Sequence, residues 1–218
     1  MATQPRAVTP PSAKSQSPAP LWMVWTAISV AGAVVGALIA WRTRLLIVSG
    51  PDLLIQALRY IATIANAIIL SGAQWFLLRR YKLDVYWWIP ATVAAGLIAG
   101  ILVIPAVLRP FASPGVVPSL SVAILSSALA LGASGAITGT AQALVLRPSA
   151  GTIALAWIPA TIVGAGLGGA ATASISEGLF LMGWPAYLSL STLAALGALL
   201  VAVSQAPVLL RVLLHHAP

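Results

Sequence analysis

The sequence contains no cysteine and very little charge. Only 6% of its 218 residues are charged, and three acidic residues stand against eleven Lys and Arg. The absence of cysteine excludes disulfides, thiol catalysis and cysteine-ligated metals. A soluble domain carries about 25% charged residues, so this chain lacks the charge to cover a surface that faces water. We therefore predict that lipid is the solvent for most of it, in agreement with a mean hydropathy of +1.02.

The three acidic residues, Asp52, Asp84 and Glu177, all fall in predicted loops. A proton-coupled carrier uses a carboxylate inside the membrane, and acid–base catalysis or a two-metal site needs several such groups close together. His215 and His216 stand in the frayed last turn, where solvation is the expected state. We therefore predict no catalytic residue, no metal ligand and no cofactor, and expect that the protein is not an enzyme.

Long apolar segments dominate what is present. A membrane-spanning helix needs about 20 apolar residues, and six segments reach that length: 21–41, 55–78, 86–108, 118–146, 154–174 and 186–211. Turn-like groups separate them, such as Arg147-Pro148-Ser149, and Ser176-Glu177-Gly178 with Gly183-Trp184-Pro185. Residues 1–20 are rich in Pro and Ser and are predicted to be a disordered tail. The fold prediction is all-α, with six transmembrane helices in residues 21–212.

The cations mark an orientation. The even-numbered loops and the tails hold seven of them (Arg6, Lys14, Arg79, Arg80, Lys82, Arg147 and Arg211), and the odd-numbered loops hold three (Arg42, Arg44 and Arg109). Loops rich in Lys and Arg stay in the cytoplasm. Both termini are therefore predicted to be cytoplasmic, in a bacterial inner (plasma) membrane. The expected partners are the lipid bilayer and other membrane subunits. Nucleic acid is not expected, because the positive charge is used for orientation.

One tract recurs along the chain. A Gln stands five residues before an Arg, and Trp-Ile-Pro-Ala-Thr opens the next segment; the copies are Gln74–Thr92 and Gln142–Thr161. A third copy is divided between the chain ends, as Trp25–Ser29 and Gln205–Arg211. Equivalent residues are 63 to 69 positions apart. This spacing predicts three repeated helical hairpins, about 21–80, 86–147 and 154–211, around a pseudo-threefold axis.

Small residues recur at fixed distances from the Trp and the Gln of each copy. Offsets 4, 7 and 11 after each Trp fall on one helical face, and they are small or hydroxyl-bearing in all three copies. Positions three and seven before each Gln are also small. Close approach of helices through small residues stabilises membrane bundles, so we predict these stripes to be helix–helix seams. Trp22, Trp25, Trp87, Trp88 and Trp157 are predicted to anchor helix ends at the cytoplasmic interface.

Six polar residues form a candidate ring. Each Gln lies about 7.5–9 Å inside the interface, with a hydroxyl at similar depth on the partner helix; the set is Gln74, Gln142, Gln205, Ser29, Thr92 and Thr161. One interpretation is that these side chains lock neighbouring helices through hydrogen bonds. The other is that they bind a small solute or a lipid head group. The threefold recurrence favours the structural role, because a binding site usually breaks symmetry.

Arg59 is the one cation predicted inside a span, and an intramembrane charge is a functional candidate. Its position near the Pro51-Asp52 break also fits an interfacial helix end, where Arg59 reaches the headgroups or pairs with Asp52. Asn66 lies deeper and is predicted to join helices. Pro207, near the end of the last span, is predicted to kink it or free a carbonyl.

The tract Gly72-Ala-Gln74-Trp75-Phe-Leu-Leu-Arg79, followed by Trp87-Trp88, resembles a group of uncharacterised multi-pass membrane proteins from cyanobacteria and Chloroflexi-type bacteria. The resemblance is clearest over 71–92 and weaker over 138–161, where Ala143 follows Gln142. The resemblance implies a bacterial origin and says nothing about an activity or a mechanism. We expect a non-catalytic accessory or scaffold subunit of a membrane complex. The alternative is a carrier or substrate-binding component for a small, mostly apolar solute, which a sealed bundle would rule out.

Overall fold

The computed structural model describes residues 19–46, 52–112 and 118–216. These residues form helices joined by short turns, with no strand among them, as the all-α prediction requires. The elements are α1 (Ala19–Leu46), α2 (Asp52–Arg80), α3 (Trp88–Ile98), the π-helix η1 (Ala99–Val103), α4 (Ile104–Leu108), the 3₁₀-helix η2 (Arg109–Phe111), α5 (Leu120–Ala150), the 3₁₀-helix η3 (Gly151–Ala156), α6 (Trp157–Leu181) and α7 (Ala186–His216).

Four helical stretches are long and apolar enough to cross a membrane: Leu21–Arg42, Trp88–Phe111, Leu120–Ser176 and Ala186–His215. The third has 57 residues and contains both α5 and α6, which pack against each other after η3 reverses the chain. In lipid every backbone N–H and C=O must be paired within the protein, and a helix achieves this locally. The chain is thus an all-helical protein with the composition and helix lengths of a membrane protein.

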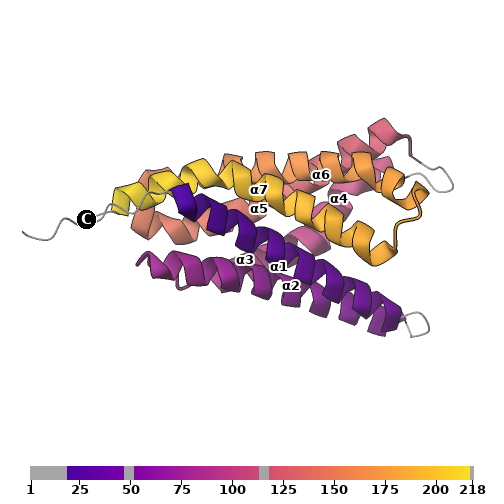
Figure 1. Ribbon diagram of the computed structural model, residues 1–218, viewed down its shortest axis with the longest axis horizontal. Coiled ribbons are helices and arrows are strands. Elements are labelled where there is room, and N and C mark those ends of the chain that lie inside the picture. Colours follow the sequence, from indigo (N-terminus) through magenta and orange to yellow (C-terminus); the bar gives the residue numbers. More distant parts are fainter. Residues whose placement is uncertain (1–18, 47–51, 113–117, 217–218) are drawn as a thin grey trace, which may run out of the picture.

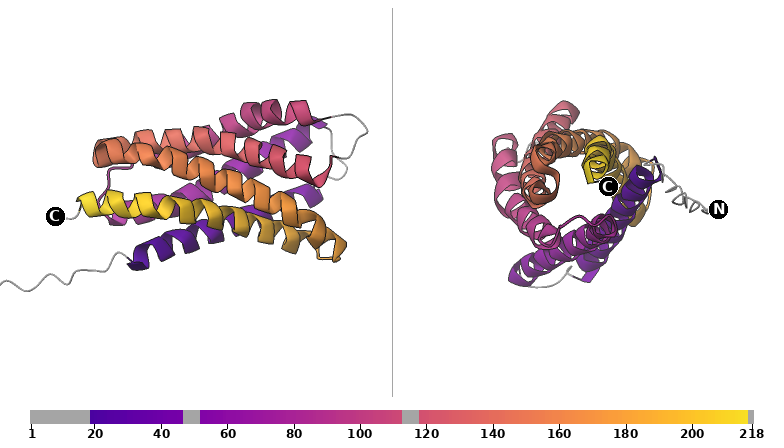
Figure 2. Two further views of the ribbon diagram at one scale, coloured as in Figure 1. Left: turned by 90° about the horizontal axis from the view of Figure 1, so that it is seen from above. Right: turned by 90° about the vertical axis from the view of Figure 1, so that its left-hand side faces the viewer.

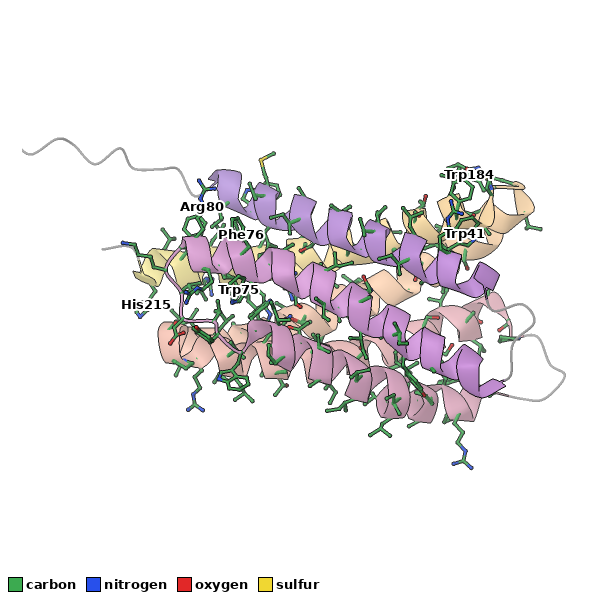
Figure 3. All side chains as sticks on the ribbon, turned by 90° about the horizontal axis from the view of Figure 1, so that it is seen from below. Trp41, Trp75, Phe76, Arg80, Trp184 and His215 are labelled. Atoms are coloured by element: carbon green, nitrogen blue, oxygen red, sulfur yellow. The ribbon has the colours of Figure 1, made fainter. Side chains whose placement is uncertain are left out.

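The helices form a closed ring, which the end-on view in Figure 2 shows. Each of α1, α2, α3, α5, α6 and α7 packs against its neighbours in the chain, and α7 closes the ring against α1. Helix α1 begins, and α7 ends, at the same end of the bundle (Figure 1). We call this the basic end, because α2 and α5 also finish there, with Arg79, Arg80 and Arg147 in their last turns. Arg80 and His215 mark the basic end in Figure 3, and Trp41 and Trp184 mark the opposite one.

The stretch Trp88–Phe111 changes its helix type near the middle. In η1 the N–H of Ile104 bonds to the carbonyl of Ala99, five residues earlier. The next residue is Pro105, which has no N–H and whose ring crowds the carbonyl four residues before it. A π-turn widens the helix at this point and relieves the crowding. The apolar sequence therefore continues as one bent stretch of helix.

Two predicted helix ends are too early, although the predicted turn at Gly183-Trp184-Pro185 is confirmed. Helix α5 runs through Pro148 to Ala150, and α6 runs past Glu177 to Leu181. The chain turns at two glycines with positive φ, a conformation that costs glycine little: Gly151 at 56°, after the predicted break at Pro148, and Gly183 at 70°, within the predicted turn. Pro148 is tolerated because it lies in the last turn and loses a single backbone hydrogen bond.

Other boundary predictions have mixed outcomes. Ala19 and Pro20, predicted to belong to the tail, are the first residues of α1, where Pro is well tolerated; residues 1–18 lie outside the described part. Helix α7 is continuous through Pro207, which is exposed. The helix therefore does not end at this proline, and the predicted kink or freed carbonyl stays a prediction.

Two glycines show why small residues are needed in the seams. A Cβ added to Gly164 of α6 would lie 2.6 Å from the Cα of Val201 on α7. One added to Gly135 of α5 would lie 2.8 Å from the backbone oxygen of Thr161 on α6. Both distances are below any real van der Waals contact, so these helices approach backbone to backbone. At these positions the predicted seams are confirmed.

Candidate functional site

The six residues of the predicted polar ring meet in three pairs. Each Gln donates from Nε2 to a hydroxyl on the preceding helix of the ring: Gln74 to Ser29 at 3.0 Å, Gln142 to Thr92 at 3.2 Å and Gln205 to Thr161 at 2.9 Å. These bonds join α1 to α2, α3 to α5, and α6 to α7. All six residues are buried, with at most 7% of their surface exposed. The pairing expected from helical depth is therefore present in each copy of the tract.

Three tryptophans lie beside these pairs, and here the sequence prediction is wrong. Trp25, Trp88 and Trp157 are 0% exposed, so they do not face the interface as anchors. Their ring centroids are 5.6 to 6.3 Å apart and their planes are 74 to 83° apart. Such edge-to-face pairs each contribute about 0.5–1.5 kcal/mol beyond their area burial. Trp22 and Trp87 are exposed, as an interfacial position requires.

One of these tryptophans also forms a hydrogen bond with a residue of the polar ring. Trp157 donates from Nε1 to Oε1 of Gln142 at 2.9 Å, so Gln142 links α3, α5 and α6. The corresponding atoms in the other two copies are buried and unpaired: Nε1 of Trp25 and Trp88, and Oε1 of Gln74 and Gln205. Each unpaired donor lies on a helix that packs against the helix of one unpaired acceptor, α3 against α2 and α1 against α7. Each of these two helix pairs therefore holds one unpaired indole N–H and one unpaired amide oxygen.

Leucines close the layer on its basic side. Leu78, Leu146 and Leu209 each follow a Gln by four residues, and none is more than 1% exposed. In a helix this spacing places the Leu one turn beyond the Gln on the same face. The sequence carries this signal in all three copies, but it was missed because Leu is common in apolar segments. The centre of the basic end is thus filled by indole rings and leucines.

The remaining candidates stand apart from this layer. The side chains of Arg59 and Asp52 lie outside the described residues, so the predicted intramembrane charge and its pairing stay predictions. Asn66 of α2 lies against Gly36 of α1, as its predicted role between helices requires, and its Oδ1 is buried without a partner. Arg79 stacks on two aromatic rings outside the core, Trp75 at 5.8 Å and Tyr86 at 5.5 Å.

The buried layer contains amides, hydroxyls and indole N–H groups, all of which are neutral. These groups can hold helices together or orient a neutral polar molecule, but they do not supply a strong general acid, base or nucleophile. Comparison of the chain with protein-family models, with curated proteins and with solved structures finds no match.

Proposed function

We propose that this protein is a non-catalytic membrane protein that serves as an accessory or scaffold subunit of a membrane complex. In this proposal α1–α2, α3–α5 and α6–α7 are three repeated hairpins that cross the membrane six times around a pseudo-threefold axis. Both termini lie in the cytoplasm of a bacterium. The basic end faces the cytoplasm, because Arg79, Arg80 and Arg147 finish helices there.

The closed core at the basic end carries this proposal. Three indole rings in mutual contact, each 0% exposed, occupy the middle of the ring of helices. The leucines Leu78, Leu146 and Leu209 belong to the same buried core cluster as these rings. A carrier needs a path for its solute from one end of the bundle to the other. Such a path would have to separate these fully buried Trp and Leu side chains. The packing therefore supports a rigid bundle over the carrier alternative.

The unpaired indole N–H groups and Gln carbonyl oxygens also favour a rigid bundle. If the three hairpins are equivalent, Trp88 donates to Gln74 and Trp25 donates to Gln205, as Trp157 does to Gln142. Six hydrogen bonds then link all six helices in a closed cycle. Each Gln joins the hydroxyl of the helix before it to the indole of the helix after it. This cycle holds the helices in one arrangement and pairs every indole N–H and every Gln carbonyl oxygen of the polar ring.

A scaffold also needs a surface for its partner. Gly96 and Gly100 are four residues apart on the same stretch of helix, and an added Cβ would meet nothing within 4 Å at either position. Gly100 is exposed on the outside of the bundle. A helix of another subunit can approach closely at such a pair. We place the partner helix along this face.

The test is purification of the full chain from its own membranes in mild detergent after chemical cross-linking. We expect one partner in a fixed ratio, and we expect Gly100→Leu to abolish its recovery without loss of the folded protein. Gly72→Leu is the matched control, since an added Cβ at Gly72 also meets nothing within 4 Å but lies on α2. A monomer without a partner, or equal losses in both variants, would overturn the proposal.

A further inference from the structure

A groove with a volume of about 610 Å³ opens on the outside of the bundle at its basic end. It lies between the loop that precedes α3, the first turn of α3 and the last turns of α5. Ligand pockets in proteins have volumes of about 300–1,000 Å³, so the groove is large enough for part of a lipid. Tyr86 and Trp87, which line it, are 74% and 71% exposed.

The loop before α3 is held in one conformation, and it forms one wall of the groove. Lys82 has a φ of 60°, and the N–H of Leu83 bonds to the carbonyl of Leu78, which ends α2 with a compact turn. The following residues then alternate in burial. Leu83 and Val85 are at most 1% exposed, whereas Asp84 and Tyr86 face outward. The core thus anchors every second residue and holds the outward ones in place.

A second contact ties this loop to α5. The backbone N–H of Asp84 donates to Oγ of Ser149 at 3.2 Å. The Asp84 carboxylate has no ion-pair partner among the described residues. It lines the groove, where it can accept hydrogen bonds from a ligand.

The inner part of the groove is apolar. Ala91 of α3 and Ala141 and Leu144 of α5 line it, and Leu144 is 58% exposed. Alanine has the smallest side chain with a Cβ, so the two alanines leave room along the seam between the helices. These residues lie further into the predicted membrane than Asp84. A hydrocarbon chain that follows the helices would meet only apolar atoms there.

Cations border the groove near the carboxylate. The guanidinium of Arg79 lies 5.5 Å from the ring centroid of Tyr86, which lines the groove. Arg147, which is exposed, directly precedes Pro148, another lining residue. A guanidinium binds phosphate well through its planar set of donors. The groove therefore contains a carboxylate, and the Arg79 guanidinium lies against Tyr86 in its wall.

We propose that this groove binds a zwitterionic phospholipid with a primary ammonium in its headgroup, phosphatidylethanolamine being the simplest. The ammonium donates hydrogen bonds to Asp84, the phosphate contacts Arg79, and one acyl chain lies along Ala91 and Ala141. A phosphatidylglycerol would bring hydroxyls in place of the ammonium and leave the carboxylate beside an anionic lipid. A phosphatidylcholine would bring a cation that cannot donate. This site does not depend on the scaffold role.

The test is native mass spectrometry of the full chain in detergent. The detergent contains equal amounts of phosphatidylethanolamine, phosphatidylglycerol and phosphatidylcholine with identical acyl chains. We expect retained phosphatidylethanolamine to exceed each of the others at least about fivefold. Asp84→Asn keeps the size of the side chain and the backbone bond to Ser149, and it should remove this preference. Trp87→Ala should lower the retention of all three lipids, because the groove loses a wall.

Trp184→Ala is the matched control, since Trp184 is an exposed tryptophan at the opposite end of the bundle. It should keep the wild-type preference. Equal retention of the three lipids by the wild-type chain would overturn the proposal. So would a preference for phosphatidylglycerol, which would mean that the cations alone recruit lipid, and so would an unchanged preference in Asp84→Asn. Thermal unfolding followed by circular dichroism shows that each variant is folded.

Discussion

The buried glutamines offer a sharp comparison between neighbouring copies of one motif. Gln142 makes two side-chain hydrogen bonds, to Thr92 and from Trp157, whereas Gln74 makes one, to Ser29. A hydrogen bond between membrane helices contributes about 0.6 kcal/mol on average. Replacement of Gln by Leu removes these hydrogen bonds and puts an apolar side chain of similar size in the same place. With the bonds as observed, Gln142→Leu should cost about 1.2 kcal/mol and Gln74→Leu about 0.6 kcal/mol.

The proposed cycle of six bonds changes this expectation. If Trp88 also donates to Gln74, both replacements should lower the free energy of unfolding by the same amount, about 1.2 kcal/mol. Trp88→Phe tests the same bond from its other side, because Phe keeps an aromatic ring and has no N–H. The coupling between Trp88→Phe and Gln74→Leu in a double-mutant cycle should then be about 0.6 kcal/mol, and near zero otherwise.

The assay is reversible unfolding in mixed detergent micelles, followed by circular dichroism at several denaturing-detergent fractions. Indole ¹H–¹⁵N resonances of the folded chain provide an independent readout, since a hydrogen-bonded indole N–H shifts downfield. The single variants Trp88→Phe and Trp157→Phe assign two of these resonances. A Gln142→Leu variant clearly less stable than Gln74→Leu, together with an indole shift for Trp157 but not for Trp88, would refute the cyclic arrangement and with it the equivalence of the hairpins.

Three other predictions follow from the packing. Trp157→Ala should lower the free energy of unfolding by about 3 kcal/mol, because it leaves a cavity in the aromatic core; micelle unfolding measures this loss. Gly164→Leu should prevent folding, because even an added Cβ would lie 2.6 Å from the backbone of α7. Gly100→Leu is the control and should leave thermal unfolding unchanged. Normal folding of both variants would contradict close packing at Gly164. In this cysteine-free chain, Ala143→Cys, 1% exposed in the closed core, should resist a water-soluble thiol reagent, whereas Lys82→Cys should react fully. Rapid labelling at 143 would argue for a carrier.

Sequence reasoning located the polar contacts well. The depth of Gln74, Gln142 and Gln205 along their segments follows from helical rise alone, and their hydroxyl partners were found by the same count. The helix stops were found less well. Arg147-Pro148 and Glu177 suggested helix ends a few residues before the observed ones at Ala150 and Leu181, whereas Gly183-Trp184-Pro185 marked the second turn correctly. A helix continues as long as packing against neighbouring helices stabilises it. Prolines and charged residues therefore predict its last residue only to within about one helical turn.

The sequence by itself determined the solvent, the secondary structure and the pairing of the glutamines. The low charge and the long apolar segments require a lipid environment. In lipid the backbone N–H and C=O groups must be hydrogen-bonded within the protein, which a helix achieves locally. The tertiary structure alone decided which way the repeated tryptophans face. Trp25, Trp88 and Trp157 stand at the depth of an interfacial belt, but the rotation of their helices turns all three inward. For Trp157 that rotation is fixed by the close approach of α6 to α5 at Gly135 and to α7 at Gly164, and therefore by packing between separate helices.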